Sequence, residues 1–205
     1  MTVFGISDFG TYCLSILVFL ALPGPGTFAL LTSTAKGGFR AGAAATLGLI
    51  AGDQVLLWLA VAGVAAVLKA HPLVFQAIQY AGALYLAWIG LRLIFAKEGG
   101  ASPVHIEPGR YARQAFLITL LNPKAIVFYM AFFPLFINPA THQGALTFGA
   151  MAVTIALITL AYCLGLCAFA GLVTRQVRAH KRLARGLERL AGVFMVGFGI
   201  RLAAN

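Results

Sequence analysis

Six long apolar runs dominate the 205-residue chain and constrain its fold more than any other feature. Each run approaches or exceeds the roughly 20 residues that a helix needs to cross the hydrocarbon core of a bilayer. Only 10% of the residues are charged, whereas a soluble domain carries about 25%. We therefore expect an all-α membrane protein with six transmembrane helices, short loops and no soluble domain. The predicted spans cover residues 11–31, 41–68, 73–95, 115–137, 145–173 and 190–204.

The distribution of positive charge predicts the orientation of these spans. Lys and Arg concentrate in the loops after spans 1, 3 and 5, and the last of these loops contains the run TRQVRAHKRLARGLERL. Cytoplasmic loops of membrane proteins carry such an excess. We therefore expect the odd-numbered loops in the cytoplasm and both termini outside. This placement assigns the net charge of +10 to topology and to contact with anionic membrane lipid, rather than to nucleic acid.

The two halves of the chain resemble each other. AGALYLAWIGLRL at residues 81–93 matches AGVFMVGFGIRL at residues 191–202, and Pro23 and Pro123 lie in the middle of spans 1 and 4. Because each half has three spans, the halves enter the membrane in opposite senses. This is a 3+3 inverted-topology repeat, a common plan for secondary transporters. The expected units are a first repeat over 1–100, a cytoplasmic linker over 101–111 and a second repeat over 112–205.

Proline and glycine interrupt two spans at matching places. Pro23, Gly24, Pro25 and Gly26 follow one another in span 1, and Asn122-Pro123 interrupts span 4. Proline removes a backbone donor, and in hydrocarbon the freed carbonyl must find another partner. Such breaks are tolerated where they are buried in protein or line a wet cavity. Two ordinary packing kinks are the alternative, but matching interruptions in both halves favour a substrate site.

Asp53 and Lys124 are the charged residues predicted to lie in the middle of a span. They could form a fixed ion pair between spans 2 and 4, or Asp53 could exchange a proton during transport. If a membrane carboxylate couples protons, Asp53 is the one candidate. Gly48 and Gly52 have the spacing that permits close helix packing. Other polar residues in the spans are more typical of helix contacts: Thr27, Gln79, Tyr85, Thr119 and Tyr129.

Other function classes find little support in the sequence. The cysteines are all in predicted spans and offer no reactive pair near the breaks, which argues against a thiol–disulfide carrier. The histidines lie in loops or at span ends, so we expect no metal site and no cofactor. No nucleophile motif is present, and we expect no enzymatic activity. A transporter of another small solute or cation on the same plan stays open as the alternative.

Four motifs occur in order along the spans: PGPG, GLIAGD, YLAWIGLRL and NPKAIVFYMAFFPLFI. Together they resemble the LysE/RhtB family of amino-acid exporters over essentially the whole chain. The ending FMVGFGIRLAA and the spacing from PGPG to GD are most similar to the leucine-efflux branch of the homoserine, threonine and leucine exporters. The resemblance implies a multi-pass protein of the bacterial inner membrane that exports a neutral amino acid, driven by the proton gradient.

The breaks and the resemblance together define a predicted site. The broken backbone is expected to hold the ammonium and carboxylate of the substrate, while Phe28 and Phe128 shape a side-chain pocket. Asp53 would couple protons, and Lys124 would neutralise it or bind the substrate carboxylate. Gly26 stands where many family members have Asn, which leaves the exact substrate open. Glycines 192, 197 and 199 could pack against span 5 or a second subunit. The full set of expected site residues is Pro23, Gly24, Pro25, Gly26, Phe28, Asp53, Asn122, Pro123, Lys124 and Phe128.

Overall fold

The computed structural model describes most of the first half of the chain and the middle of the second. The described residues are 4–6, 8–22, 24–70, 106–132, 136–137 and 143–170, with the single residues 84, 88, 91, 95, 189, 193, 196 and 197. Within these ranges the chain forms helices and no strand, apart from an isolated antiparallel bridge between Ile6 and Ile137. The all-helical expectation is confirmed for this part of the molecule.

The first predicted span is broken into two helices. Helix α1 (Phe9–Ala21) begins at Asp8, whose carboxylate accepts a hydrogen bond from the Thr11 amide, and it ends at Leu22. Helix α2 (Pro25–Ala70) begins at the third residue of the PGPG motif, after a break that includes Leu22 and Gly24. Proline suits the first position of a helix, because its fixed φ is helical and an N–H there would have no helical partner.

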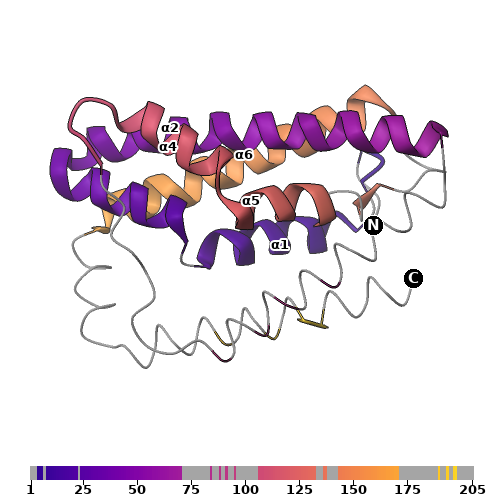
Figure 1. Ribbon diagram of the computed structural model, residues 1–205, viewed down its shortest axis with the longest axis horizontal. Coiled ribbons are helices and arrows are strands. Elements are labelled where there is room, and N and C mark those ends of the chain that lie inside the picture. The colour runs from indigo at the N-terminus through magenta and orange to yellow at the C-terminus, as the bar shows by residue number, and fades with distance from the viewer. Residues whose placement is uncertain are drawn as a thin grey trace.

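Helix α2 contains a sharp turn that separates the first two predicted spans. Its backbone leaves the helical region at Gly37 and Gly38, and the φ of 68° at Gly38 is in the left-handed region that favours glycine. Figure 1 shows the chain turning back at this point. We call residues 25–36 and 39–70 the first and second segments of α2. The predicted loop is thus reduced to a tight glycine turn.

The fourth predicted span is also broken. Helix α4 (Tyr111–Leu120) is followed by Leu121 and Asn122, then by the short helix α5 (Pro123–Val127) and the π-helix η1 (Phe128–Phe132). The side-chain oxygen of Asn122 accepts a hydrogen bond from the Lys124 amide at 3.1 Å and caps α5. Pro123 is the first residue of α5, as Pro25 is of α2, so the structural counterpart of Pro123 is Pro25 and not Pro23.

Helix α6 (Ala145–Ala168) covers the fifth predicted span and packs with α4 against α2 (Figure 1). The contact between α2 and α4 is close because both predicted glycines are there. A Cβ at Gly52 would lie 2.7 Å from the Cβ of Thr119, and one at Gly48 would overlap the carbonyl oxygen of Ala112. The prediction of a small-residue contact at Gly48 and Gly52 is confirmed.

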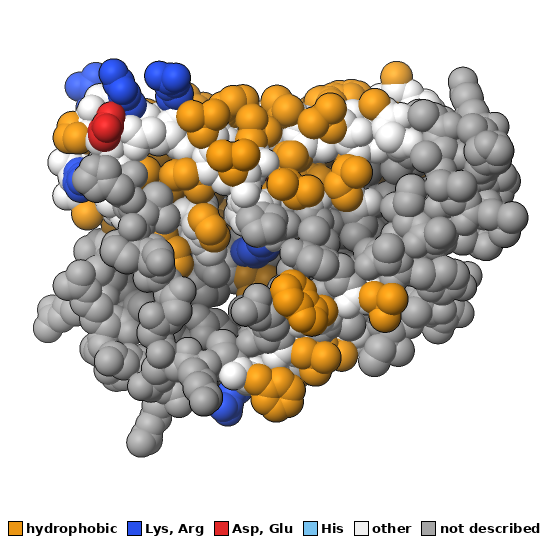
Figure 2. Space-filling view, in the orientation of Figure 1, with side chains coloured by type: hydrophobic (Ala, Val, Ile, Leu, Met, Phe, Trp, Pro, Cys, Tyr) orange, Lys and Arg blue, Asp and Glu red, His pale blue; other side chains and the backbone are white. Residues whose placement is uncertain are grey.

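The described surface has the character of a protein that faces lipid. Helix Ala145–Ala168 is long and apolar enough to cross a membrane, and so by length and composition is the stretch Pro25–Gly63, which includes the turn at Gly37 and Gly38. Orange apolar side chains cover much of the described part of the face in Figure 2, and a blue cluster lies at one end. Several large apolar residues are more than half exposed: Leu47, Leu59, Leu146, Val153 and Leu157. Exposed cations at the end with the glycine turn include Lys36, Arg40, Arg110 and Arg113.

Several sequence-based expectations fall outside the described residues. Predicted spans 73–95 and 190–204 do so apart from single positions, as do Pro23 and two of the three glycines considered for subunit packing, 192 and 199. The other four predicted spans contain the helices given above. The bounds differ in detail, since α4 begins at Tyr111, the last residue assigned to the linker.

Candidate functional site

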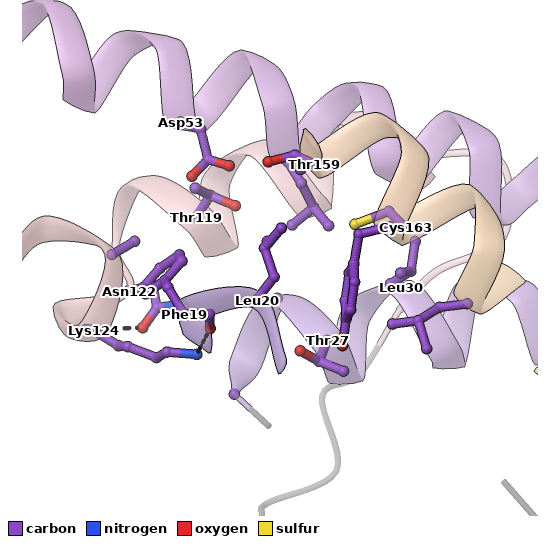
Figure 3. Close-up of a pocket in the computed structure, with 16 residues that line it drawn as sticks. Phe19, Leu20, Thr27, Leu30, Asp53, Thr119, Asn122, Lys124, Thr159 and Cys163 are labelled. Carbon is purple, nitrogen blue, oxygen red and sulfur yellow. Dashed lines mark hydrogen bonds between the residues drawn. The ribbon is translucent and has the colours of Figure 1, made fainter. Parts of the chain in front are cut away.

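A cavity of about 50 Å³ lies where the two broken spans meet (Figure 3). By this measure it is large enough for a few water molecules. Both segments of α2, the ends of α1 and α4, helix α5 and one face of α6 contribute to its wall. The described lining residues are Phe19, Leu20, Gly24, Gly26, Thr27, Leu30, Leu49, Asp53, Thr119, Asn122, Lys124, Ala125, Thr159, Tyr162, Cys163 and Leu166.

The lining separates into a polar and an apolar end. The polar end consists of Asp53, Thr119, Asn122 and Lys124, which lie together on one side of Figure 3. Leu30 and Cys163 lie on the other side of the view, with Thr159 between the two groups. The other end is mainly apolar and is called the apolar end: it consists of Gly26, Thr27, Leu30, Leu49, Tyr162, Cys163 and Leu166. The cavity can therefore contact a molecule that has both charged and apolar parts.

Lys124 caps the C-terminal end of α1 across the boundary between the two broken spans. Its ammonium Nζ donates to the carbonyl oxygens of Phe19 at 2.8 Å and Leu22 at 2.7 Å. The Phe19 carbonyl lies four residues before Pro23, which has no N–H to offer it. A cation at a helix C-terminus also interacts favourably with the helix dipole. The ammonium thus replaces a hydrogen bond that the proline sequence removes.

Aromatic packing and a small residue hold the Lys124 side chain in place. Nζ lies 4.5 Å from the centroid of the Phe19 ring, which stacks on Phe128 at 4.0 Å. A Cβ at Gly24 would lie 3.5 Å from Cδ of Lys124 and 3.6 Å from Nζ, so the lysine runs close to the PGPG backbone. A side chain of the second broken span therefore supplies hydrogen bonds that the first broken span lacks.

Asp53 projects from the second segment of α2 into the polar end and is only 5% exposed. Its carboxyl group is hydrogen-bonded to the hydroxyl of Tyr129, which η1 carries. Figure 3 shows Asp53 pointing toward Thr119, on the opposite wall from Lys124. Among the residues that the structure describes, the one ion pair within 4.0 Å joins Arg110 and Glu107. Asp53 and Lys124 thus share the cavity without the direct pair that was considered.

The structure brings together five of the predicted site residues and leaves others aside. Gly24, Gly26, Asp53, Asn122 and Lys124 all line the cavity. Pro25 and Pro123 begin the two half-helices beside it, and Pro23 falls outside the described residues.

The expectation that Phe28 and Phe128 line the pocket is not met. Neither is among the described lining residues. Phe128 is buried behind the cavity, in contact with Phe19 and Tyr129.

Helix α6 supplies cavity residues that have no role in the predicted site. Thr159, Tyr162, Cys163 and Leu166 are spaced as i, i+3, i+4 and i+7, so they share one face of the helix. This spacing is visible in the sequence. The spacing did not predict which face of α6 lines the cavity, because α6 is apolar on all sides and has no polar face for comparison.

Within the described ranges, no group of three or more His, Cys, Asp or Glu side chains is placed to hold a metal ion. The chemistry available at the cavity is therefore that of the named side chains and of the interrupted backbone. These are one carboxylate, one ammonium group, hydroxyl groups and helix ends.

The structure combines apolar helices that can cross a membrane with two interrupted spans that meet around a cavity with a polar and an apolar end. These are features of a membrane transport protein. The comparison with known families agrees and is more specific. Residues 17–205 match the LysE type translocator family, and the chain belongs to it. It is a translocator and not an enzyme, and the resemblance noted from its motifs is confirmed.

Curated relatives match nearly the full length of the chain. It is 35% identical to a leucine efflux protein of Klebsiella pneumoniae, over 98% of this chain and 96% of that protein. It is 35% identical to a leucine efflux protein of an Enterobacter species, over 98% and 97% of the two chains. A leucine efflux protein of Salmonella typhimurium is 32% identical over 98% and 96%. No solved structure gives a significant match.

Proposed function

We propose that this protein exports small neutral amino acids, leucine-like in their side chains, across the bacterial inner membrane in exchange for protons. The relatives named leucine efflux protein support the substrate class. The single observation that carries the proposal is the cavity between the two broken spans, with charged groups at one end and aliphatic groups at the other.

The polar end suits the two charged groups of an amino acid. A carboxylate would interact with the ammonium of Lys124, and an ammonium group would interact with Asp53 and the Thr119 hydroxyl. Charged side chains at membrane depth are costly and mark transport pathways. The residues expected to bind these charged groups are therefore Gly24, Asn122 and Lys124, with Gly26 further along the same cavity. The half-helices that begin at Pro25 and Pro123 flank them.

Asp53 is proposed to carry the coupled proton. It is a buried carboxyl group within hydrogen-bonding reach of a second ionisable group, Tyr129, in the wall of the substrate cavity. A change in the distance between Asp53 and Lys124 during alternating access would change the affinity of Asp53 for a proton. Proton and substrate would thereby be linked through one cavity.

The architecture proposed for this cycle is the 3+3 inverted repeat, with units 1–100 and 112–205 joined by the linker 101–111. The matching helix–break–helix arrangements of spans 1 and 4 support it, since each places a proline first in its second helix. Transport would alternate the cavity between the two sides of the membrane by movement of one repeat against the other.

Purified protein in liposomes tests the proposal. Vesicles loaded with a mixture of amino acids receive a pH gradient, and mass spectrometry identifies the amino acids that leave. We expect leucine-like amino acids to leave in response to the gradient and Asp53→Asn to lose that response. Asp8→Asn is the matched control, because Asp8 is an exposed acid and Asn is also a good helix N-cap. Export of no amino acid under any gradient would refute the substrate class.

A further inference from the structure

The apolar end of the cavity has no role in binding the charged groups of an amino acid. We propose that it receives the side chain of the transported amino acid and selects aliphatic side chains, with Gly26 as the residue that keeps this end apolar. This inference rests on the proposed export of amino acids and names the part of the site that sets the substrate range.

Three separate segments of the chain meet at this end, so the apolar surface is a pocket between helices and not the apolar face of a single helix. Gly26 and Leu30 come from the first segment of α2, Leu49 from the second, and Tyr162 and Leu166 from α6. Leu30 and Leu49 belong to a hydrophobic cluster that is distinct from the larger core around Tyr12 and Leu57, and Tyr162 and Leu166 pack against it.

The pocket and the charged groups have the relative placement that an amino acid requires. The charged groups of an amino acid are attached to one carbon, and its side chain points away from both. In Figure 3, Asp53 and Lys124 lie on one side of the cavity and Leu30 lies on the other. A bound zwitterion at the polar end would therefore direct its side chain toward the apolar end.

Gly26 has a specific part in this arrangement. A Cβ placed on it would lie 3.3 Å from Cδ2 of Leu49, so the bare backbone of Gly26 packs directly against that leucine. A polar side chain at position 26 would enter the apolar end and displace the tip of Leu49. Glycine therefore favours an aliphatic substrate at this position over a hydroxylated one.

Thr27 offers the opposing hypothesis. Its hydroxyl also lines the cavity, on the same side of Figure 3 as Leu30, and could bind a hydroxylated side chain such as that of threonine or homoserine. The aliphatic assignment is favoured because three leucines, Leu30, Leu49 and Leu166, line this end, against the hydroxyl groups of Thr27 and Tyr162.

The test compares export rates of leucine, phenylalanine and threonine from liposomes under one pH gradient. Leu166→Ala enlarges the apolar end, and we expect it to raise the phenylalanine-to-leucine ratio about tenfold, the size of effect that one or two methylene groups have in a hydrophobic pocket. Gly26→Asn is expected to lower the leucine-to-threonine ratio by about the same factor. Leu157→Ala is the matched control, because Leu157 is on the same helix but 60% exposed. It should leave both ratios unchanged.

A second measurement does not depend on pocket variants that could fold poorly. Cys163 lines the cavity, and the protein has two other cysteines, Cys13 and Cys167. In a Cys13→Ala, Cys167→Ser background, the rate at which methyl methanethiosulfonate modifies Cys163 reports on occupancy of the cavity. We expect leucine to slow this reaction severalfold more than threonine does.

The outcomes separate this inference from the proposed function. If the wild type exports leucine but both ratios stay unchanged and leucine gives Cys163 no greater protection than threonine, the pocket assignment is wrong and amino-acid export stands. If Thr27→Val abolishes export of a preferred threonine, the hydroxylated assignment replaces the aliphatic one. If the wild type moves no amino acid, both proposals fall together.

Discussion

At the scale of the residue, Lys124 shows how one side chain can satisfy backbone carbonyls at a helix break in another part of the chain. Its ammonium group donates to two carbonyls at the end of α1, at 2.7 and 2.8 Å, although it belongs to α5. In a membrane interior such carbonyls have no water to replace a lost partner. The lysine is therefore a structural element of the cavity as well as a charge within it.

Replacement of Lys124 should destabilise the fold measurably. Lys124→Met keeps much of the side-chain length but leaves two carbonyls without a donor, and we expect the free energy of unfolding to fall by about 1–3 kcal/mol. Lys124→Arg should lose less, because it retains both the charge and the donors. Thermal unfolding in detergent measures the difference.

Lys36→Met provides the control for this effect. Lys36 also donates to a backbone carbonyl, that of Ile106 at 2.8 Å, but the residue is exposed and makes one such bond. Its loss should cost less than the loss of Lys124. Equal effects of the two substitutions would contradict the capping role.

Tyr129 is the residue partner of Asp53, and its hydroxyl can be removed with little change in packing. Tyr129→Phe keeps the ring that packs edge-on against Phe128. It leaves the buried carboxyl group without this hydrogen bond, so we expect export driven by the pH gradient to slow about tenfold or more and its pH profile to shift. Export measured across a range of pH values checks this. Tyr12→Phe is the control, because Tyr12 is also buried but donates to the Met151 carbonyl. If the pH profile of export is the same in Tyr129→Phe as in the wild type, the Tyr129 hydroxyl has no part in proton coupling.

The sequence predicted which residues at the site are unusual, but not which partners they have. Asp53 and Lys124 stand out because charge is rare inside apolar spans. The contact of Lys124 with Phe19 and Leu22 depends on how two distant spans pack, and no local pattern encodes that geometry. The exclusion of Phe28 has the same origin, since its position relative to the cavity is fixed by where α2 starts and turns.

At the scale of the element, the proline breaks were predictable and the other irregularities were not. Pro25 and Pro123 begin helices for a local chemical reason, which is that proline has no N–H. The turn at Gly37 and Gly38 is shorter than the loop expected between two spans. The π-helix from Phe128 to Phe132 also has no marker in the sequence, because its extra residue per turn is accommodated by packing around it.

The contact of α2 with α4 provides a prediction at this scale. A Cβ at Gly52 would lie 2.7 Å from Cβ of Thr119 and 3.1 Å from the Phe116 carbonyl oxygen, both on α4. Gly52→Ala should therefore force the helices apart and reduce the free energy of unfolding by about 1–3 kcal/mol. Gly63→Ala is the matched control on the same helix, because a Cβ there meets nothing within 4 Å. Equal melting temperatures for the two variants would show that the helices are not held this close.

At the scale of the whole molecule, cationic and apolar side chains are separated along the length of the described helices. The exposed cations Lys36, Arg40, Arg110 and Arg113 gather at the end with the glycine turn, and the helices leading away from it present apolar side chains outward (Figure 2). The start of α1 near Asp8 is at the other end (Figure 1). The sequence alone predicted this separation, because the charge of the loops and the hydropathy of the spans can be read along the chain without any tertiary contact.

This separation predicts the orientation of the protein in the membrane. The positive-inside rule places the end with Arg113 in the cytoplasm and Asp8 outside. In a background without native cysteines, Asp8→Cys should react with a membrane-impermeant thiol reagent in cells whose outer membrane is permeabilised and whose inner membrane is intact. Arg113→Cys should react only after the inner membrane is opened. Both positions are exposed, so a difference in labelling reports the side of the membrane and not burial. The reverse labelling pattern would mean that the end with Arg113 faces outward and Asp8 faces the cytoplasm, which is the opposite of the proposed topology.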